Sequence, residues 1–304
     1  MRLQQVYAGG RFGLSFEIFP PKTPEGDAAL RTTLNELAVW NPAFISCTYG
    51  AGGSTSRQTL DWCQYIQDQH QVPATAHFTC VGSSRNELIQ WLQAASDSGV
   101  RNIMALRGDA PHGETKFQVA PDGLAHASQL VTLIREQFPD MGIGVAGYPE
   151  KHPESCDLGS DLQHQVQKVA AGADALFTQL FFENRHFFQF RNRLHELGVT
   201  VPIVPGIMPI TEYARIVRIS SMCGSDIPLR LAVRLEEVQH DKVAQFEIGV
   251  QFAIEQCRVL LEEGIPGIHF YALNKSPECS RILQELELPQ TSDWGILPRP
   301  LGTR

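Results

Sequence analysis

Eight short runs of apolar and β-branched residues, separated by longer amphipathic stretches, restrict the folds that this chain can adopt. The first run lies within Leu14–Lys22, and the others are Phe44–Thr48, Ala74–Cys80, Asn102–Leu106, Ile143–Gly147, Ala175–Leu180, Pro202–Gly206 and Gly267–Ala272. The stretches between them carry apolar residues at helical spacing: Asp27–Trp40, Thr55–Gln69, Arg85–Ser98, Gly123–Gln137, Asp161–Ala171, Arg185–Leu197 and Gln245–Glu263. This pattern is typical of buried strands covered by helices.

Several of the predicted helices end at a glycine shortly before the next strand, at Gly99, Gly172, Gly198 and Gly264. Glycine after a helix is what a left-handed C-cap requires. An alternation of strand and helix repeated eight times predicts an α/β protein of the (β/α)8 TIM barrel type. A doubly wound sheet is less favoured, because no G-x-G-x-x-G follows the first strand.

The predicted barrel forms one domain with an elaboration and a tail. We expect residues 1–288 to form this domain and the proline-containing residues 289–304 to form a C-terminal extension. Within the domain, Thr211–Asp241 predicts two additional helices with a break at Gly224–Pro228 before the last strand.

The composition of the chain indicates which partners it can bind and which cellular compartment suits it. The chain has 304 residues, 43% of them hydrophobic, which is enough for a large core, and its net charge of −8 disfavours nucleic acid and anionic membranes as partners. Its seven cysteines never form C-x-x-C, which indicates reduced thiols in a cytoplasmic protein. We expect no signal peptide, because Met1–Gln5 is not followed by a continuous apolar segment. No apolar run reaches membrane-spanning length.

The first strand carries a carboxylate near its end. Glu17 shares one face with Ser15 and Phe19, and Pro20 and Pro21 then end the strand because neither can donate to a ladder. A carboxylate in apolar surroundings must be paired, hydrogen-bonded or protonated. Glu17 is therefore either paired with an arginine on a neighbouring strand or a general acid with a raised pKa.

Polar side chains also gather where the other strands end, which is where the active sites of such barrels lie. They comprise the glycine-rich turn Thr48–Thr55, then Thr75, His77 and Thr79, then Arg107 and Asp109, then Tyr148, Glu150 and His152, then Gln179, and finally His269, Tyr271, Asn274 and Lys275. Each has a structural alternative: the turn could be only a turn, His77 a core residue, and Arg107 and Asp109 an ion pair. No strand interior carries a Schiff-base lysine, and the histidines show no metal-ligand spacing.

Six motifs together resemble the methylenetetrahydrofolate reductase family. They are Ser15–Lys22, Thr48–Gly53, Leu106–Asp109, Gly147–Glu154, Thr178–Phe182 and Pro205–Pro209, and the likeness extends from about Phe12 to Leu288. The length resembles the short bacterial form, which consists of the catalytic domain only. The resemblance implies that the barrel of residues 1–288 binds FAD. NADH or NADPH would reduce the FAD, which would then reduce 5,10-methylenetetrahydrofolate to 5-methyltetrahydrofolate.

The resemblance also implies roles for individual residues. Glu17 would protonate N10 of the folate, and Asp109 would lie between flavin and pterin and stabilise a cationic intermediate. Gln179, Tyr213 and Lys275 would join Asp109 in binding the substrate. The residues implied in FAD binding are Thr48, Tyr49, Ala51, His77, Arg107, Gly108, Asp109, Tyr148, His152, Ser155, Asp161, His164 and Lys168, and no metal is implied.

This chain departs from the family pattern at three places. Gln163–Lys168 keeps only Lys168 as a charged residue where family members often have several basic residues. Tyr213 replaces the usual phenylalanine, and Lys275 replaces an arginine and so keeps the charge without the bidentate fork. The segment between Asp109 and Asp122 aligns poorly, and no role is assigned to it.

Two other functions remain open at the level of sequence. One is an FAD-dependent barrel of the proline dehydrogenase kind that oxidises an amine, and the other is a barrel that binds flavin or folate without turnover. The choice between NADH and NADPH also stays open, as does whether the chain forms a homo-oligomer.

Overall fold

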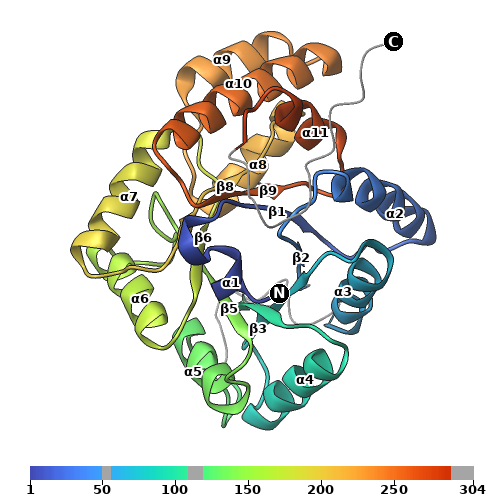
Figure 1. Cartoon of the computed structure of the whole chain (residues 1–304). Helices are drawn as coiled ribbons and strands as arrows, with labels where there is room; N and C mark the ends of the chain where they lie inside the picture. The colour runs from blue at the N-terminus through green and yellow to red at the C-terminus, as the bar shows by residue number, and fades with distance from the viewer. Residues whose placement is uncertain (50–55, 109–118, 289–304) are drawn as a thin grey trace.

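The computed structural model describes residues 1–49, 56–108 and 119–288. Its parallel strands are β1 (Gly13–Ile18), β2 (Phe44–Cys47), β3 (Ala74–Thr79), β4 (Asn102–Leu106), β5 (Gly142–Gly147), β6 (Ala175–Thr178), β7 (Ile203–Val204), β8 (Gly206–Ile207) and β9 (Gly267–Tyr271). They pair in the order β7-β6-β5-β4-β3-β2-β1-β9-β8. Helices surround this ring of strands (Figure 1). The predicted (β/α)8 barrel is confirmed.

The seventh strand of the prediction, Pro202–Gly206, is split into β7 and β8 by Pro205. Proline has no N–H to donate, so the ladder is interrupted at this residue. The segment before it pairs with β6, the segment after it pairs with β9, and the carbonyl of Pro205 accepts from the His269 N–H at 3.0 Å. The two short strands therefore close the ring in the place of one.

Each predicted helix is present, with ends that differ from the prediction by a few residues. The helices that follow the strands are α2 (Pro24–Ala38), α3 (Ser56–His70), α4 (Arg85–Asp97), α5 (Ala127–Gln137), α6 (Leu158–Ala170), α7 (Asn184–Glu196) and α10 (Lys242–Glu262). The glycines expected to end helices all have positive φ, from 67° at Gly264 to 115° at Gly172. A large core fills the space between helices and strands and includes Phe16, Phe78 and Phe270.

The N-terminal end of the barrel is closed by α1 (Leu3–Val6), a short helix that the sequence pattern did not reveal, followed by the 3-10 turn η1 (Ala8–Gly10). The side chain of Asn102 accepts from the Leu3 N–H at 2.8 Å and donates to the Met1 carbonyl at 2.9 Å. Leu3 and Val6 then pack on Phe44 and other residues inside the barrel. Figure 1 shows α1 across the centre of the ring.

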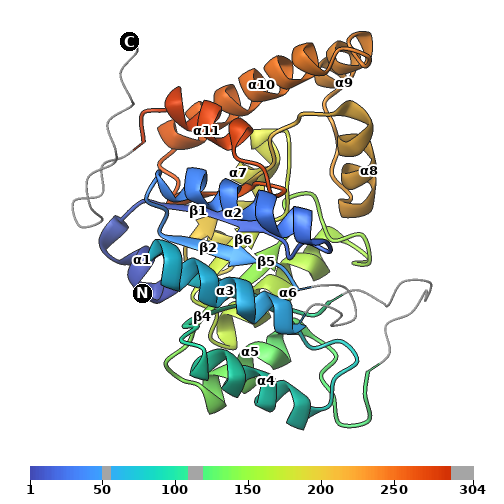
Figure 2. The ribbon, with the colours of Figure 1, turned by 90° about the vertical axis from the view of Figure 1, so that its right-hand side faces the viewer.

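The predicted break in Thr211–Asp241 is confirmed: α8 (Tyr213–Cys223) ends at Gly224, and α9 (Leu229–Glu237) begins after Pro228. Figure 2 shows α1 and α8 on opposite sides of the strands. A last helix, α11 (Pro277–Gln284), was not predicted. The described residues contain no helix that is both long and apolar enough to cross a membrane. The predicted extension at 289–304 lies outside the described residues.

Candidate active site

The barrel brings Glu17 between two histidines from other strands. Oε2 of Glu17 lies 3.2 Å from Nε2 of His77 on β3 and 3.4 Å from Nε2 of His269 on β9. Nδ1 of His269 is 2.8 Å from the hydroxyl of Ser15, two residues before Glu17 on β1. Both imidazoles are buried, whereas the Glu17 side chain keeps 19% of its surface exposed. A carboxylate linked to two imidazoles and open to solvent on one side can exchange a proton with a bound molecule.

The two histidines change the expected protonation of Glu17. Burial alone would raise the pKa of this carboxyl, but the charge of His77 and the hydrogen bond from His269 outweigh burial and lower the pKa to about 2. The expectation of a raised pKa is therefore wrong for the protein without substrate. The alternative of an arginine partner is also wrong for the described residues, since the partners of Glu17 are the imidazoles of His77 and His269.

A second polar group lies on the loops that follow β4 and β5. The guanidinium of Arg107 donates to both carboxylate oxygens of Glu154, at 2.5 and 2.9 Å. Burial, followed by the charge of Arg107, lowers the pKa of His152, whose Nδ1 accepts from the Glu154 N–H at 3.1 Å. The ring of His152 meets that of Tyr148 edge-on, with centroids 4.5 Å apart. Arg107, Tyr148 and His152 thus form one connected group.

The first half of α6 continues this group with buried polar side chains that lack partners. Oδ1 of Asp161 accepts from the Ser155 hydroxyl at 2.9 Å, but Oδ2 is buried without a hydrogen-bond partner among the described residues. The same holds for Oε1 of Gln165. Unpaired buried acceptors are costly and suit a ligand that donates hydroxyl or N–H groups.

Lys168 lies one turn beyond Gln165 and points its amine toward the strands. Its Nζ donates to the carbonyl of Ala146 on β5 at 2.5 Å. Burial lowers the pKa of Lys168 to about 8, although the charge of Asp161 acts in the opposite direction. An anion bound beside this lysine would raise its pKa and favour the charged form.

Gly108 and Thr48 shape the rim of the site through the backbone. Gly108 has φ +90°, and a Cβ at this position would lie 2.6 Å from Cγ1 of Val81. The turn after β4 therefore requires glycine. Thr48 continues β2, where its carbonyl accepts from the Thr59 hydroxyl at 2.9 Å.

Most of the other residues selected from the sequence contact neighbours outside these groups. The ring of Tyr49 packs edge-on against Phe78 and Trp91, on the helix-facing side of β3. His164 is exposed on α6, and the Gln179 carboxamide accepts from the Leu180 N–H at 2.9 Å. Tyr213 begins α8, where its N–H donates to Gln245 at 2.7 Å. Asp109 and Ala51 lie outside the described residues.

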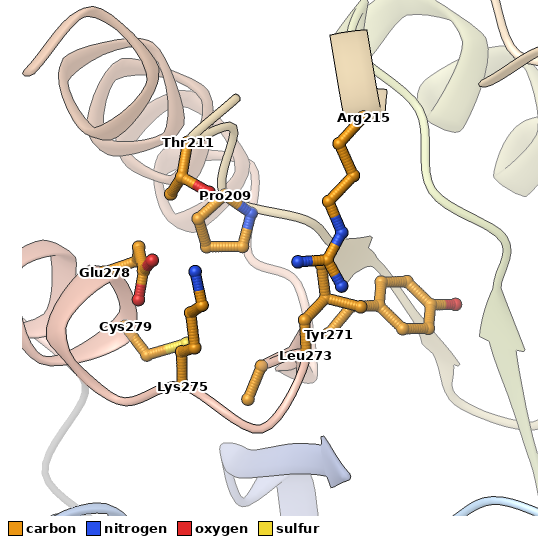
Figure 3. Close-up of a pocket in the computed structure, with 9 residues that line it drawn as sticks. Pro209, Thr211, Arg215, Tyr271, Leu273, Lys275, Glu278 and Cys279 are labelled. Carbon is orange, nitrogen blue, oxygen red and sulfur yellow. The ribbon is translucent and has the colours of Figure 1, made fainter. Parts of the chain in front are cut away.

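A pocket lies at the end of β9 (Figure 3). It is lined by Pro209, Thr211, Arg215, Tyr271, Ala272, Leu273, Lys275, Glu278 and Cys279. Tyr271 pairs in register with Glu17 across β9 and β1, and its hydroxyl donates to the Thr178 carbonyl at 2.6 Å. The pocket and the carboxylate therefore lie at the same end of the barrel.

Sequence reasoning did not assign four residues that the structure places in or beside the site. His269 was noted on the face of Tyr271 but given no role, although its register with Ser15 puts it beside Glu17. Glu154 and Gln165 lie in segments noted from the sequence but were given no role, and Arg215 was not noted. The place of each depends on a contact or a pocket formed by distant segments.

A family model and individual relatives of this chain point to the same protein family. The family model described as methylenetetrahydrofolate reductase matches residues 2–287. A 5,10-methylenetetrahydrofolate reductase of Escherichia coli is 34% identical over 267 residues, which cover 88% of each chain. Methylenetetrahydrofolate reductase (NADH) 1 of Arabidopsis thaliana is 37% identical over 94% of this chain. This chain spans only 50% of the length of that plant protein.

Solved structures show the same fold at lower sequence similarity. A Clostridium thermocellum protein described as binding two copies of 5-methyl-5,6,7,8-tetrahydrofolic acid has a TM-score of 0.61 and 15% identity, covering 93% of this chain and 97% of its own. An oxaloacetate acetylhydrolase has a TM-score of 0.52 and 12% identity, covering 93% of this chain and 83% of its own. At these identities the likeness concerns the barrel alone.

Proposed function

Because this chain belongs to the methylenetetrahydrofolate reductase family, we propose that it reduces 5,10-methylenetetrahydrofolate to 5-methyltetrahydrofolate with electrons from a nicotinamide dinucleotide. The observation that carries the proposal is the partly open Glu17 carboxylate held between His77 and His269. Proton transfer to a ring nitrogen is the step for which such a group is suited. The name of the Arabidopsis relative favours NADH as the donor. We place the reaction in the cytoplasm, in keeping with the reduced cysteines.

Enzymes of this family are flavoproteins, and the flavin that we propose here is FAD. The described residues fit it: the unpaired oxygens of Asp161 and Gln165 can accept from ribose hydroxyls, and Lys168 can face an anionic diphosphate. The FAD site would also include residues from the loops after β4 and β5, namely Arg107, Gly108, Tyr148, His152 and Ser155. The edges of the site would be formed by Thr48, Tyr49, Ala51 and His164. When bound, FAD would carry hydride from the dinucleotide to the folate.

Glu17 would deliver the proton that opens the folate ring at N10. Since its pKa is about 2 without substrate, Glu17 is ionised at neutral pH in the free protein. A bound substrate that covers the exposed side of the carboxylate would remove water and favour the neutral acid. Ser15 would fix the ring orientation of His269 through the 2.8 Å contact at Nδ1. Glu17 and the two histidines thus would act as one proton-holding unit.

The remaining residues would place the substrate against this unit. We propose that Asp109, which follows Gly108, stabilises positive charge on the folate in the transition state. Gln179 at the end of β6 would hydrogen-bond the pterin, Tyr213 would stack on the substrate, and Lys275 would face its acidic end.

Absorbance measurements test the proposal. The purified protein, loaded with FAD, should lose its flavin absorbance when NADH is added without oxygen and regain it when 5,10-methylenetetrahydrofolate is added. Reoxidation by the folate would exclude both an amine oxidase of the proline dehydrogenase kind and a barrel that binds without turnover. Bleaching without reoxidation by the folate would contradict the proposed function.

A further inference from the structure

Glu150 lies between two residues of the proposed FAD site, and the proposed function gives it no role. Its neighbours Tyr148 and His152 meet with ring centroids 4.5 Å apart, on the loop 148–155 that follows β5, called here the flavin loop. Glu150 bonds instead to a distant segment, since its Oε2 accepts from the Asp226 N–H at 3.0 Å. Asp226 lies in the turn between α8 and α9, so this bond joins the flavin loop to the elaboration of the barrel.

The turn between α8 and α9 also packs directly on the flavin loop. Gly224, which ends α8 with φ +71°, approaches so closely that a Cβ there would lie 3.2 Å from Cγ of Pro153. Lys151 has φ 96°, which is rare outside glycine, and its Nζ donates to the carbonyls of His152 and Ser155 at 3.0 and 2.6 Å. Strain of this kind persists only where the surroundings hold it in place. The position of the flavin loop therefore depends on its contact with the turn.

Charged groups surround Glu150 on the elements that pack against it. Asp226 lies on the turn, and Glu183, at the start of α7, pairs with Arg230 of α9 at 3.6 Å. Arg185, in the first turn of α7, supplies an opposing positive charge. Oε1 of Glu150 is buried without a hydrogen-bond partner among the described residues. A carboxyl oxygen in this position is better tolerated when the group is neutral.

The proton on Glu150 is linked to the contact between the flavin loop and the turn. Burial raises the pKa of Glu150 to about 7, and the charges of Asp226 and Glu183 outside the loop act in the same direction. A loop released from the turn would expose the carboxyl and return its pKa toward 4.5. Between these two values the held loop keeps a proton that the released loop loses, so a rise in pH favours release. Burial lowers the pKa of His186, which faces the same charges, so this histidine is mostly neutral near pH 7.

We propose that Glu150 is a positioning residue for the FAD site: as a neutral acid it holds the flavin loop against the turn between α8 and α9, and loss of its proton loosens the loop and weakens flavin binding. This inference rests on the proposed function, in which Tyr148 and His152 contact FAD. It makes the FAD affinity of this chain depend on pH through a side chain that does not itself touch the cofactor.

The dissociation constant of FAD, measured by flavin fluorescence on the full chain freed of FAD, tests the inference at pH 6.0 and pH 7.5. In the wild type the constant should rise between these pH values by about three- to eightfold more than in Glu150→Gln, which keeps the shape of the neutral acid. The titration of Lys168 contributes equally to both proteins and cancels in this comparison. Glu196→Gln, at the exposed end of α7, is the matched control and should keep the wild-type rise.

Two further variants change the charge around Glu150 and leave its hydrogen bond to the Asp226 N–H in place. Asp226→Asn removes a like charge and should reduce the rise, whereas Arg185→Gln removes an opposite charge and should enlarge it. A hydrogen bond that only holds the fold together predicts no such opposite changes. These two variants also decide the matter should Glu150→Gln fail to fold.

Hydrogen exchange provides a readout without the cofactor. In the FAD-free protein at pH 7.5, residues 148–155 should exchange more slowly in Glu150→Gln than in the wild type. An equal rise of the FAD dissociation constant in these two proteins, or changes of the same sign in Asp226→Asn and Arg185→Gln, would overturn the inference and leave the proposed function intact. Failure of the wild type to bind FAD at either pH would contradict the proposed FAD site itself.

Discussion

Nε2 of His269 on the last strand lies 3.4 Å from Oε2 of Glu17 on the first strand, at the seam where the barrel closes. The pair exists only because β1 and β9 lie in register, with Ser15 opposite His269 and Glu17 opposite Tyr271. The pairing of the first and last strands therefore places His269 beside Glu17.

The first prediction concerns acid stability. Because folding lowers the pKa of Glu17 from 4.5 to about 2, its ionised form stabilises the protein above pH 4.5, and this contribution is lost as the pH falls toward 2. Glu17→Gln should therefore lose less stability than the wild type between pH 5 and about pH 2.5. Chemical denaturation at several pH values measures the difference. Parallel curves for the two proteins would show that Glu17 is not paired with the histidines.

The second prediction concerns Lys168 and FAD. Its pKa of about 8 should rise when the anionic diphosphate binds beside it, so FAD binding should take up protons near pH 8.5. Titration calorimetry in buffers of different ionisation enthalpy measures this uptake. Lys168→Gln should abolish it, whereas Lys242→Gln, at the exposed start of α10, should not change it. Equal uptake in the wild type and in Lys168→Gln would show that another group titrates.

The third prediction concerns two glycines with positive φ and separates the cost of backbone strain from the cost of steric crowding. Gly198→Ala introduces only the strain of a left-handed conformation, because nothing lies within 4 Å of the new Cβ. It should lower the free energy of unfolding by about 1 kcal/mol. Gly108→Ala adds contacts of 2.6 and 2.9 Å with Val81 and Thr79, and its cost should be nearer to about 3 kcal/mol. Urea denaturation of both variants tests this order, and equal costs would contradict the crowding at Gly108.

The fourth prediction concerns Asp109, whose role remains a proposal. A carboxylate beside the flavin disfavours the anionic reduced form, so Asp109→Asn should raise the midpoint potential of bound FAD. Folate reduction should slow by about 10- to 1000-fold, because the positive charge on the folate loses its partner. Asp122→Asn, on the same connection between β4 and α5, is the control and should leave the potential unchanged. An unchanged or lowered potential in a folded Asp109→Asn variant would remove the electrostatic role.

Strand and helix positions could be predicted because hydrophobic periodicity and the glycine caps act locally. The break at Pro205 was also visible in principle, since proline cannot continue a ladder, but only the pairing of β7 and β8 with different neighbours shows its effect. Helix α1, which closes the N-terminal end of the barrel, is too short to show helical periodicity in its hydrophobic residues. Its place depends on Asn102, which lies 99 residues from Leu3.

The sequence predicted many of the residues that form the site but not the pKa values of those residues. Glu17 and His77 were selected from single strands, but the lowered pKa of Glu17 depends on two imidazoles whose distances no local pattern encodes. Arg107 was expected either to pair with Asp109 or to bind the cofactor. Its bidentate contact with Glu154 spans 47 residues and depends on how two loops approach each other.

The half-reactions of Glu17→Gln test the central claim most directly. Reduction of bound FAD by NADH needs no proton from Glu17 and should proceed in this variant as in the wild type, with Glu25→Gln on the exposed start of α2 as the control. Reoxidation by 5,10-methylenetetrahydrofolate should slow by about 100- to 10,000-fold, the usual contribution of a general acid. Stopped-flow absorbance measures both steps. Reoxidation at the wild-type rate, or equal loss of both half-reactions in a folded variant, would contradict the role of Glu17 as the proton donor.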